Sequence, residues 1–196
     1  MPKIAEFIVW HTLIEGLQTF EERHAYNTQQ YEWLSPTSMP GVDIYGVTLI
    51  DQQWCFAVVE IKWSENCAYS QITSPTQGLV HDLKKLFEGC PSSRLINRLS
   101  ALRCLLRRNP ECREALEGLR SVIIGPDPSH TRGVLFVGFF IGDTAKASDK
   151  RGFDKAYRSF HKKASEWGWQ SSQLHTYAIT GTPLADMLDT IAQGRV

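Results

Sequence analysis

The stretch Gly41-Val42-Asp43, followed by Val58-Val59-Glu60-Ile61-Lys62, decides how this chain is predicted to fold. Asp43 stands where one apolar strand begins, and Glu60 and Lys62 close a second strand. Because successive side chains of a strand point to opposite faces, Glu60 and Lys62 share one face. Val59 and Ile61 point the other way, into a core. The pattern predicts two acids and a lysine at one end of a β-hairpin.

These residue types suit metal-assisted phosphodiester hydrolysis. Mg²⁺ or Mn²⁺ held by the carboxylates of Asp43 and Glu60 would activate a water and neutralise charge on the phosphate. The backbone carbonyl of Ile61 is a further candidate oxygen ligand, and Lys62 would orient the water or stabilise developing negative charge. The simpler alternative is an exposed strand end with a Glu60–Lys62 ion pair of little energetic value.

Length and composition predict a single α/β domain over residues 1–196. The chain is 42% hydrophobic, which is enough for one sizeable core. Its formal net charge is zero, but residues 1–62 hold three basic and eight acidic residues, and the remainder has the opposite excess. An acidic part of the chain that binds a cation and a basic remainder that binds a polyanion would explain this distribution of charge. Charges that drifted apart by chance explain the same observation.

Cysteine usage and hydropathy predict a cytoplasmic protein. The five cysteines form no CxxC pair and no zinc-like spacing with histidine, so they are expected to be reduced thiols. No signal peptide is recognisable at Met1-Pro2-Lys3. The longest apolar run, near Val134–Ile141, is too short to cross a bilayer, so no membrane association is expected.

Apolar periodicity and chain breakers predict alternating helices and strands. We expect a helix at 3–26, strands at about 43–50 and 54–63 joined by Asp51-Gln52-Gln53, a helix from Ser74-Pro75 to about Glu88, a helix at about 92–108, a short helix to about Gly118, strands at 121–124 and 133–141, a helix at 153–167, a strand at 174–179 and a helix at about 183–193. This order predicts a mixed central β-sheet flanked by α-helices.

The first helix offers a further acid. With Trp10 as the reference, residue 21 falls at about 20° around the helix, inside the apolar stripe. An acid that points to a core is unusual unless a group there needs a negative charge. Glu21 is therefore the first candidate, with Glu22, Glu15 and Glu6 behind it, and a helix end reaching solvent is the alternative.

Taken together, Gly41-Val42-Asp43 and Glu60-Ile61-Lys62 between two helices resemble the PD-(D/E)XK nuclease superfamily. The resemblance implies a restriction-endonuclease-like core, with Asp43 and Glu60 as Mg²⁺ ligands, Lys62 as the catalytic lysine and Glu21 as the first-helix acid. The literal Pro-Asp pair of the family is missing, because Gly41 and Val42 separate Pro40 from Asp43.

Gln77 and His81 lie four residues apart on the predicted second helix and would share a face. They resemble the Gln and aromatic residue that some members of the superfamily place beside the active site, where these contact nucleic acid. This resemblance makes Gln77 a candidate site residue. A polar helix face in solvent is the competing interpretation for both.

A narrower resemblance covers most of residues 41–190. The order Val-Glu-Ile-Lys, helix, Arg-rich helix and Val134-Leu-Phe-Val-Gly-Phe-Phe-Ile-Gly-Asp143 is similar to the C-terminal domain of the Hachiman nuclease subunit (HamA) and to anti-bacteriophage protein A. It implies a DNA nuclease that acts as the effector of prokaryotic anti-phage defence, with a helicase subunit encoded nearby. The alternatives are a non-catalytic, nuclease-like DNA-binding or partner subunit and a restriction endonuclease.

Two basic segments would supply a surface for DNA. Residues 94–120 hold seven arginines and three glutamates. Residues 146–163 add a second set, with Tyr157 and His161 interleaved for stacking or phosphate contacts. Either helix alone is equally consistent with a solvated face. Together with a metal-nuclease motif, they predict a track for DNA.

Overall fold

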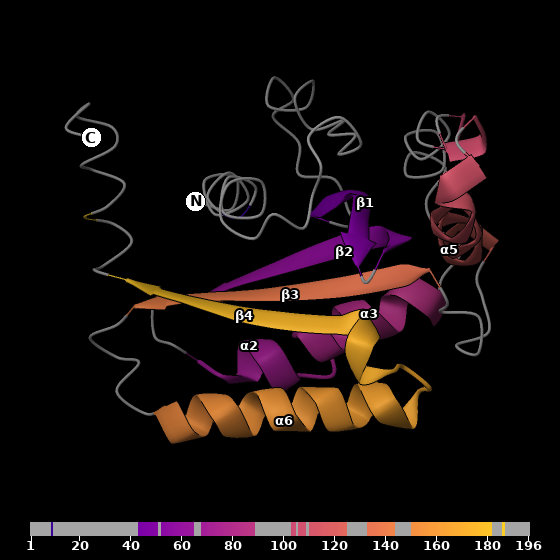
Figure 1. Cartoon of the computed structure of the whole chain (residues 1–196). Coiled ribbons are helices and arrows are strands. Elements are labelled where there is room, and N and C mark those ends of the chain that lie inside the picture. The colour runs from indigo at the N-terminus through magenta and orange to yellow at the C-terminus, as the bar shows by residue number, and fades with distance from the viewer. Residues whose placement is uncertain are drawn as a thin grey trace.

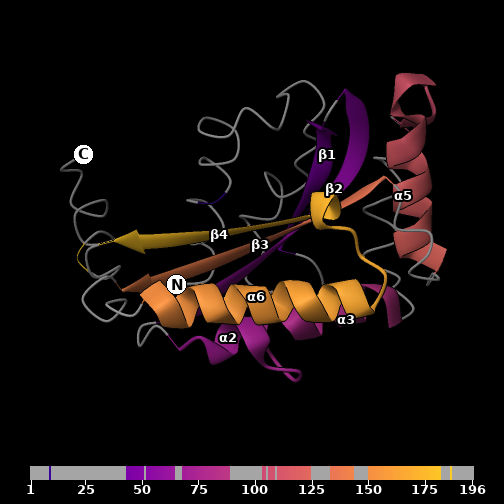
Figure 2. The same cartoon turned by 60° about the horizontal axis from the view of Figure 1, so that its bottom comes forward.

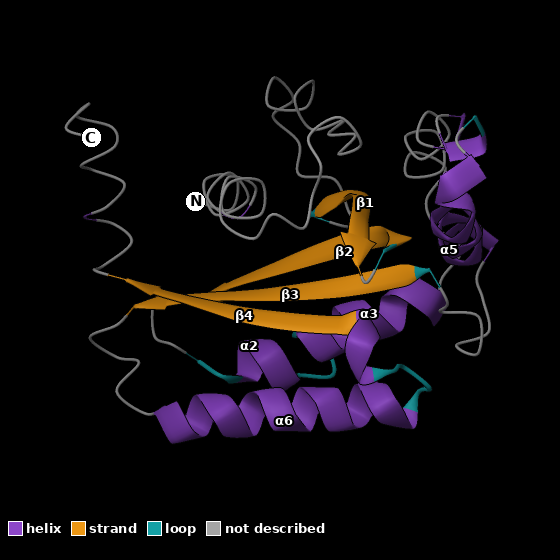
Figure 3. Cartoon of the chain, viewed as in Figure 1, coloured by secondary structure: helices purple, strands orange, loops and turns teal. Residues whose placement is uncertain are grey.

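The computed structural model describes residues 9, 43–50, 52–64, 68–88, 103–104, 106–108, 110–124, 133–143, 150–181 and 186. Figure 1 shows the chain and Figure 3 its secondary structure. The elements with defined bounds are β1 (Ile44–Ile50), β2 (Gln53–Ser64), α2 (Ser70–Thr73), α3 (Leu79–Glu88), η3 (Pro110–Cys112), α5 (Arg113–Ile124), β3 (Val134–Asp143), α6 (Lys150–Glu166), η5 (Ser171–Gln173) and β4 (Leu174–Gly181).

The four strands form one mixed sheet in the order β1-β2-β3-β4. β1 and β2 pair as an antiparallel hairpin, whereas β2, β3 and β4 run parallel. Parallel neighbours need crossover connections, and the chain between β3 and β4 includes α6. The predicted mixed α/β fold is therefore confirmed at this level, as are the strands expected at 43–50, 54–63, 133–141 and 174–179.

The sheet is packed on both faces. On one face, Phe56 and Val58 of β2 join a core that includes buried residues of α2, α3, α5 and α6. α2, α3 and α6 lie together on this face of the sheet (Figures 1 and 2). On the other face, Ala57 and Val59 belong to a second cluster, which also contains the helical Val9. β3 is buried throughout residues 134–142, which confirms the prediction of a strand covered on both sides.

The alternation of β2 confirms the predicted division between its two faces. Val59 belongs to the second cluster, and Ile61 and Trp63 pack against that cluster. Glu60 and Lys62 therefore point to the face that α3 and α6 cover. The polar pair of the hairpin thus lies beneath helices.

Four element predictions were wrong, two of them between β2 and α3. The helix expected from Ser74-Pro75 begins at Leu79, because Pro75, Thr76 and Gln77 form a turn. The hydrogen bond from the Gly78 amide to the Ser74 carbonyl (3.1 Å) closes that turn. Upstream, α2 occupies residues that were expected to be a loop.

Residues 121–124, expected to be a strand, form the last turn of α5. A short apolar run does not distinguish a buried strand from a buried helix face. Gly118 was expected to end a short helix, but it lies inside α5. The backbone of Gly133 passes very close to it, and a residue without a side chain leaves room for this approach. A Cβ at this position would lie 2.3 Å from the carbonyl oxygen of Gly133, the residue before β3.

The other predicted helices are covered in part. α6 matches the expected helix at 153–167, with an earlier start. Residues 103, 104, 106 and 107 are helical, as expected for the helix at 92–108. Most of the helices predicted at 3–26 and 183–193 lies outside the described residues. Among the described residues, no helix has the length and apolar character needed to span a membrane.

Candidate active site

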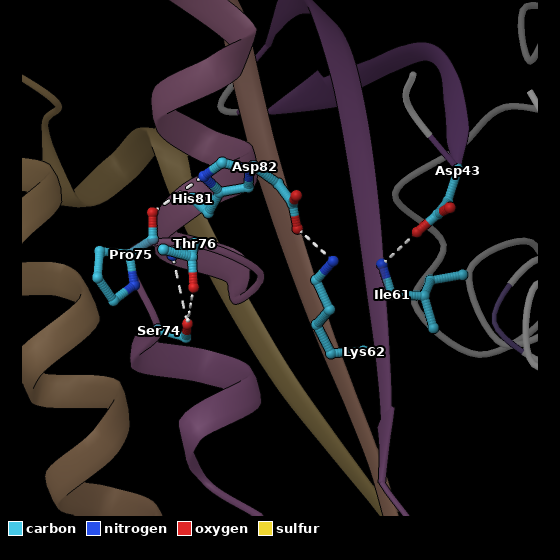
Figure 4. Close-up of polar contacts among 8 residues, drawn as sticks. All are labelled: Asp43, Ile61, Lys62, Ser74, Pro75, Thr76, His81 and Asp82. Carbon is cyan, nitrogen blue, oxygen red and sulfur yellow. Dashed lines mark hydrogen bonds and ion pairs between the residues drawn. The ribbon is translucent and has the colours of Figure 1, made fainter. Parts of the chain in front are cut away.

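The β1–β2 hairpin brings Asp43 beside Glu60. Ile44 pairs with Val59, so the residue before β1 lies next to the position that follows Val59. The amide of Ile61 donates a hydrogen bond of 2.7 Å to Oδ2 of Asp43 (Figure 4). Both backbone groups of a strand residue face the same neighbouring strand, so the carbonyl of Ile61 faces the side on which Asp43 lies. The predicted grouping of Asp43, Glu60 and Ile61 is therefore observed.

Glu60 is a buried carboxyl group beside a second one. It is 7% exposed, and Asp43 lies next to it across the hairpin. Burial raises the pKa of Glu60 well above its usual range, and the negative charges of Asp43 and Asp82 raise it further. Lys62 opposes this shift. The ionised form of Glu60 is therefore less favourable in the folded protein than in water.

Burial also raises the pKa of Asp43. The amide of Ile61 and the charge of Lys62 counteract this effect, because both favour the ionised carboxylate. The charge of Asp82 acts in the same direction as burial. The ionisation of Asp43 and that of Glu60 therefore disfavour each other, as expected for two neighbouring carboxyl groups.

Lys62 has a partner that the sequence analysis did not identify. Its ammonium nitrogen lies 2.5 Å from Oδ2 of Asp82 in α3 (Figure 4). The side chains of Lys62 and Asp82 are only 20% and 17% exposed. The alternative of an exposed strand end with a Glu60–Lys62 ion pair is therefore wrong, because Glu60 is buried and Lys62 pairs with Asp82.

Close packing of α3 on the sheet places Asp82. Leu79, Val80 and Leu83 are buried in the first core and fix the inner side of the helix. Gly138 of β3, which pairs with Glu60, leaves the space for this approach. A Cβ on Gly138 would lie 2.9 Å from a methyl carbon of Leu79. A glycine beside Glu60 thus lets the helix that carries Asp82 come close.

The helical phase contains the signal that would have found Asp82. At 100° per residue, Asp82 falls about 60° from Leu79, on the flank of the buried stripe. Gln77 and His81 would fall on the opposite side. The same phase argument that selected Glu21 in the first helix therefore favours Asp82 over Gln77.

Gln77 and His81 lie apart from this arrangement. Gln77 is exposed in the turn before α3. A ring nitrogen of His81, Nδ1, lies 3.0 Å from the carbonyl oxygen of Pro75, within the same turn (Figure 4). The described polar contact of Lys62 comes from Asp82 and not from this pair. Glu6, Glu15, Glu21 and Glu22 lie outside the described residues.

The donor set at the hairpin is small. Within the described ranges, no group of three or more His, Cys, Asp or Glu side chains is arranged to hold a metal ion. Mg²⁺, however, commonly takes one or two carboxylates and keeps several waters. The adjacent carboxylates of Asp43 and Glu60 meet that need, since a cation between them would relieve their repulsion. The chemistry of these two carboxylates therefore fits Mg²⁺ or Mn²⁺.

The basic segments are only partly directed to solvent. Lys155, Arg158 and Lys162 are exposed along α6. Tyr157 and His161, expected to contact nucleic acid, instead face the sheet. The hydroxyl of Tyr157 donates to the carbonyl of Tyr177, and Nε2 of His161 lies 3.0 Å from Oγ1 of Thr176. The expected stacking role of Tyr157 and His161 is therefore wrong, because β4 engages both side chains.

The arginines of the other segment vary in their surroundings. Arg107, Arg108 and Arg113 are exposed. Arg120 forms an ion pair with Glu117 one helical turn earlier, at 2.5 Å. The exposed basic residues thus occur on α5, on α6 and in the segment before η3.

Comparison with known proteins finds no matching family model, no significantly similar curated protein and no significantly similar solved structure. Interpretation of the site therefore depends on its own geometry and chemistry.

Proposed function

We propose that this protein is a Mg²⁺-dependent deoxyribonuclease with a restriction-endonuclease-like core. The observation that carries the proposal is the pair of Asp43 and buried Glu60, adjacent across the hairpin, with Lys62 on the same face of β2 as Glu60. Burial of two adjacent carboxyl groups opposes folding unless something offsets their repulsion. Metal binding explains why such groups are retained.

Each residue of the cluster has a distinct part in the proposed reaction. Asp43 and Glu60 would hold the ion through carboxylate oxygens, and Ile61 would add its backbone carbonyl. When bound, Mg²⁺ supplies an activated water and neutralises charge on the scissile phosphate. Lys62 would donate a hydrogen bond from its ammonium to the attacking water or to a phosphate oxygen. The helices that cover this face limit competing bulk water.

The proposed substrate follows from the exposed basic residues, and the proposed biological setting follows from the family resemblance. The exposed bases of α6 suit the DNA backbone and carry no base-reading pattern. The resemblance to the Hachiman nuclease subunit supports a role as an effector of prokaryotic anti-phage defence in the cytoplasm, with a helicase partner. A helicase gene beside this one would support that setting, and a methyltransferase gene would favour a restriction endonuclease.

A nuclease assay with matched variants tests the proposal. Purified protein, alone and with its neighbouring helicase, is incubated with linear duplex and single-stranded DNA in Mg²⁺, in Mn²⁺ and in EDTA. Degradation is expected with either metal and not in EDTA, and Glu60→Gln and Lys62→Met should each abolish it. Glu117→Gln, which breaks an exposed ion pair elsewhere, serves as the control. Full activity in both site variants contradicts the assignment.

A non-catalytic DNA-binding subunit is the second candidate. The observation that favours it is the missing Pro-Asp pair, since Gly41 and Val42 separate Pro40 from Asp43. Calorimetric titration with Mn²⁺ separates the two functions. A nuclease should show a saturable site that Asp43→Asn removes, whereas a binding-only protein should show none.

A further inference from the structure

The pair of Lys62 and Asp82 joins two elements at the centre of the proposed site. Lys62 lies near the end of β2, and Asp82 lies in the first turn of α3. Their charged atoms are 2.5 Å apart, and at least four-fifths of each side chain is removed from solvent. The contact therefore depends on the packing of a helix against the sheet and not on neighbouring positions in one helix.

The pair of Arg120 and Glu117 provides a comparison within the same chain. Its charged atoms are also 2.5 Å apart, but the side chains are 39% and 50% exposed and belong to successive turns of α5. Such a pair contributes little in water. The short distance alone therefore does not distinguish the pair of Lys62 and Asp82. What distinguishes this pair is its burial and its position beside Asp43 and Glu60.

Asp82 adds a third carboxylate to a place that already holds two. Its partner Lys62 lies two residues after Glu60 on the same face of β2, so the charge of Asp82 repels those of Asp43 and Glu60. A carboxylate that served stability alone would be poorly placed beside two others. Its favourable contact within the described residues is with the ammonium of Lys62. The role of Asp82 therefore depends on its contact with Lys62.

The lysine side chain is a flexible four-carbon stem that carries a mobile point charge. An ammonium that serves a reaction must occupy one place, and small displacements of a reacting group are costly. We propose that Asp82 is a positioning residue that fixes the ammonium of Lys62 beside the Asp43–Glu60 pair. The proposal rests on the proposed nuclease function and assigns Asp82 no direct contact with metal or DNA.

Amine labelling tests the positioning independently of activity. The protein is treated briefly with an amine-reactive acylating reagent, and modification of each lysine is measured by peptide mass spectrometry. Lys84 and Lys85, which are exposed on α3, serve as internal references. Lys62 should react more slowly than both in the wild type. In Asp82→Asn its labelling should rise about fivefold, the equivalent of about 1 kcal/mol.

Kinetics and metal binding separate positioning from metal ligation. Asp82→Asn should lower kcat about 10–100-fold, as loss of an outer-shell partner typically does. KM for DNA and the Kd for Mn²⁺ should stay within about twofold of wild type, because neither involves the ammonium in the ground state. Asp82→Glu, which keeps the carboxylate, should restore part of kcat. Glu117→Gln should change none of these quantities.

Two results would overturn the role assigned to Asp82. One is labelling of Lys62 that is equal in wild type and Asp82→Asn, with both proteins folded by circular dichroism. The other is a loss of Mn²⁺ affinity as large as that of Asp43→Asn, which would make Asp82 a metal ligand. Failure of the nuclease function has a different signature. In that case wild type degrades no DNA under any condition, while the labelling result still decides whether Asp82 holds Lys62.

Discussion

Asp43 and Glu60 lie side by side across the β1–β2 hairpin, and the amide of Ile61, the residue after Glu60, donates a hydrogen bond of 2.7 Å to Oδ2 of Asp43. Two neighbouring carboxylates repel each other, and either a proton or a divalent cation relieves that repulsion. A proton and a divalent cation are thus alternative ways to offset the negative charge of the same two carboxylates. This relationship makes the stability of the protein depend on both pH and metal.

Stability in EDTA should fall as the pH rises. The pKa values of Asp43 and Glu60 are raised above their ordinary values of 3.8 and 4.5, so the folded protein keeps protons that the unfolded chain has released. Stability from this pair is fully present below the ordinary values and is lost as pH rises through the folded ones. Urea unfolding between about pH 5 and 8 measures the effect, and Mg²⁺ should reverse the trend because ions compete with protons.

Glu60→Gln should stabilise the protein at high pH in EDTA. The amide keeps the size of the side chain and removes a buried charge that needs a proton or a metal. Its free energy of unfolding should exceed that of wild type at about pH 8 by about 1 kcal/mol or more, and the difference should vanish near pH 4. Mg²⁺ should stabilise wild type and leave the variant unchanged. Equal pH profiles for the two proteins would contradict the raised pKa of Glu60.

Lys62→Met should destabilise the fold more than Asp82→Asn. Loss of Lys62 leaves three carboxylates with no described counter-charge, whereas loss of the Asp82 charge leaves Lys62 near two carboxylates. We expect a cost of about 1–3 kcal/mol for Lys62→Met. For Asp82→Asn we expect less than about 1 kcal/mol, because relief of repulsion offsets the lost ion pair. Thermal unfolding at pH 7 in EDTA measures both, and the reverse order would contradict this charge balance.

The sequence predicted the hairpin well because strand alternation is a local property. Val59 and Ile61 had to face a core, so Glu60 and Lys62 had to face the other way. Asp82 was missed because its role depends on how closely α3 packs on β3, which the absence of a side chain at Gly138 permits. The helical phase places Asp82 on the flank of the buried stripe, but it does not report a contact with Lys62, because that contact joins residues distant in the chain.

The incorrect prediction of a strand at 121–124 has the same cause, because contacts between distant parts of the chain decided the outcome there as well. The apolar run of residues 122–124 fits a strand or a helix equally well by composition. Gly118 suggested a break, but its role is to let α5 touch the backbone before β3. The tertiary contact between α5 and the backbone of Gly133 therefore explains why this glycine lies inside a helix and does not end it.

Gly118→Ala should destabilise the protein more than Gly138→Ala. Alanine is intrinsically the better helix residue by about 1 kcal/mol, yet its Cβ would lie 2.3 Å from the backbone oxygen of Gly133. Backbone cannot yield locally, so α5 must shift, and we expect a net loss of about 1–3 kcal/mol. At Gly138 the Cβ would meet a methyl group of Leu79, which can rotate. Urea unfolding compares the two.

Gly138→Ala has a second expected consequence, in activity. Rotation of the Leu79 side chain changes how the first turn of α3, which carries Asp82, packs on β3. The variant should therefore lose more kcat than stability, and labelling of Lys62 should rise as it does in Asp82→Asn. Unchanged labelling with unchanged kcat would show that the position of α3 does not govern Lys62.

The exposed face of α6 should contribute to DNA binding through charge alone. Lys155, Arg158 and Lys162 recur along one side of the helix. If all three contact phosphates, the combined alanine variant should reduce the magnitude of the slope of log K against log salt by about 3 on duplex DNA. Fluorescence anisotropy of labelled duplexes at several salt concentrations gives this slope, with EDTA present to prevent cleavage.

The matched control removes exposed lysines from another helix. Lys84→Ala/Lys85→Ala lowers the charge of the protein without touching α6, so a general effect of net charge would change its slope in proportion. A contact at α6 predicts a large change in the α6 variant and almost none in the control, whatever the sequence of the duplex. Equal changes per charge would mean that DNA senses only the overall field of the protein. An unchanged slope in the α6 variant would place the DNA track elsewhere, with the arginines at 107, 108 and 113 as the next basic group to vary.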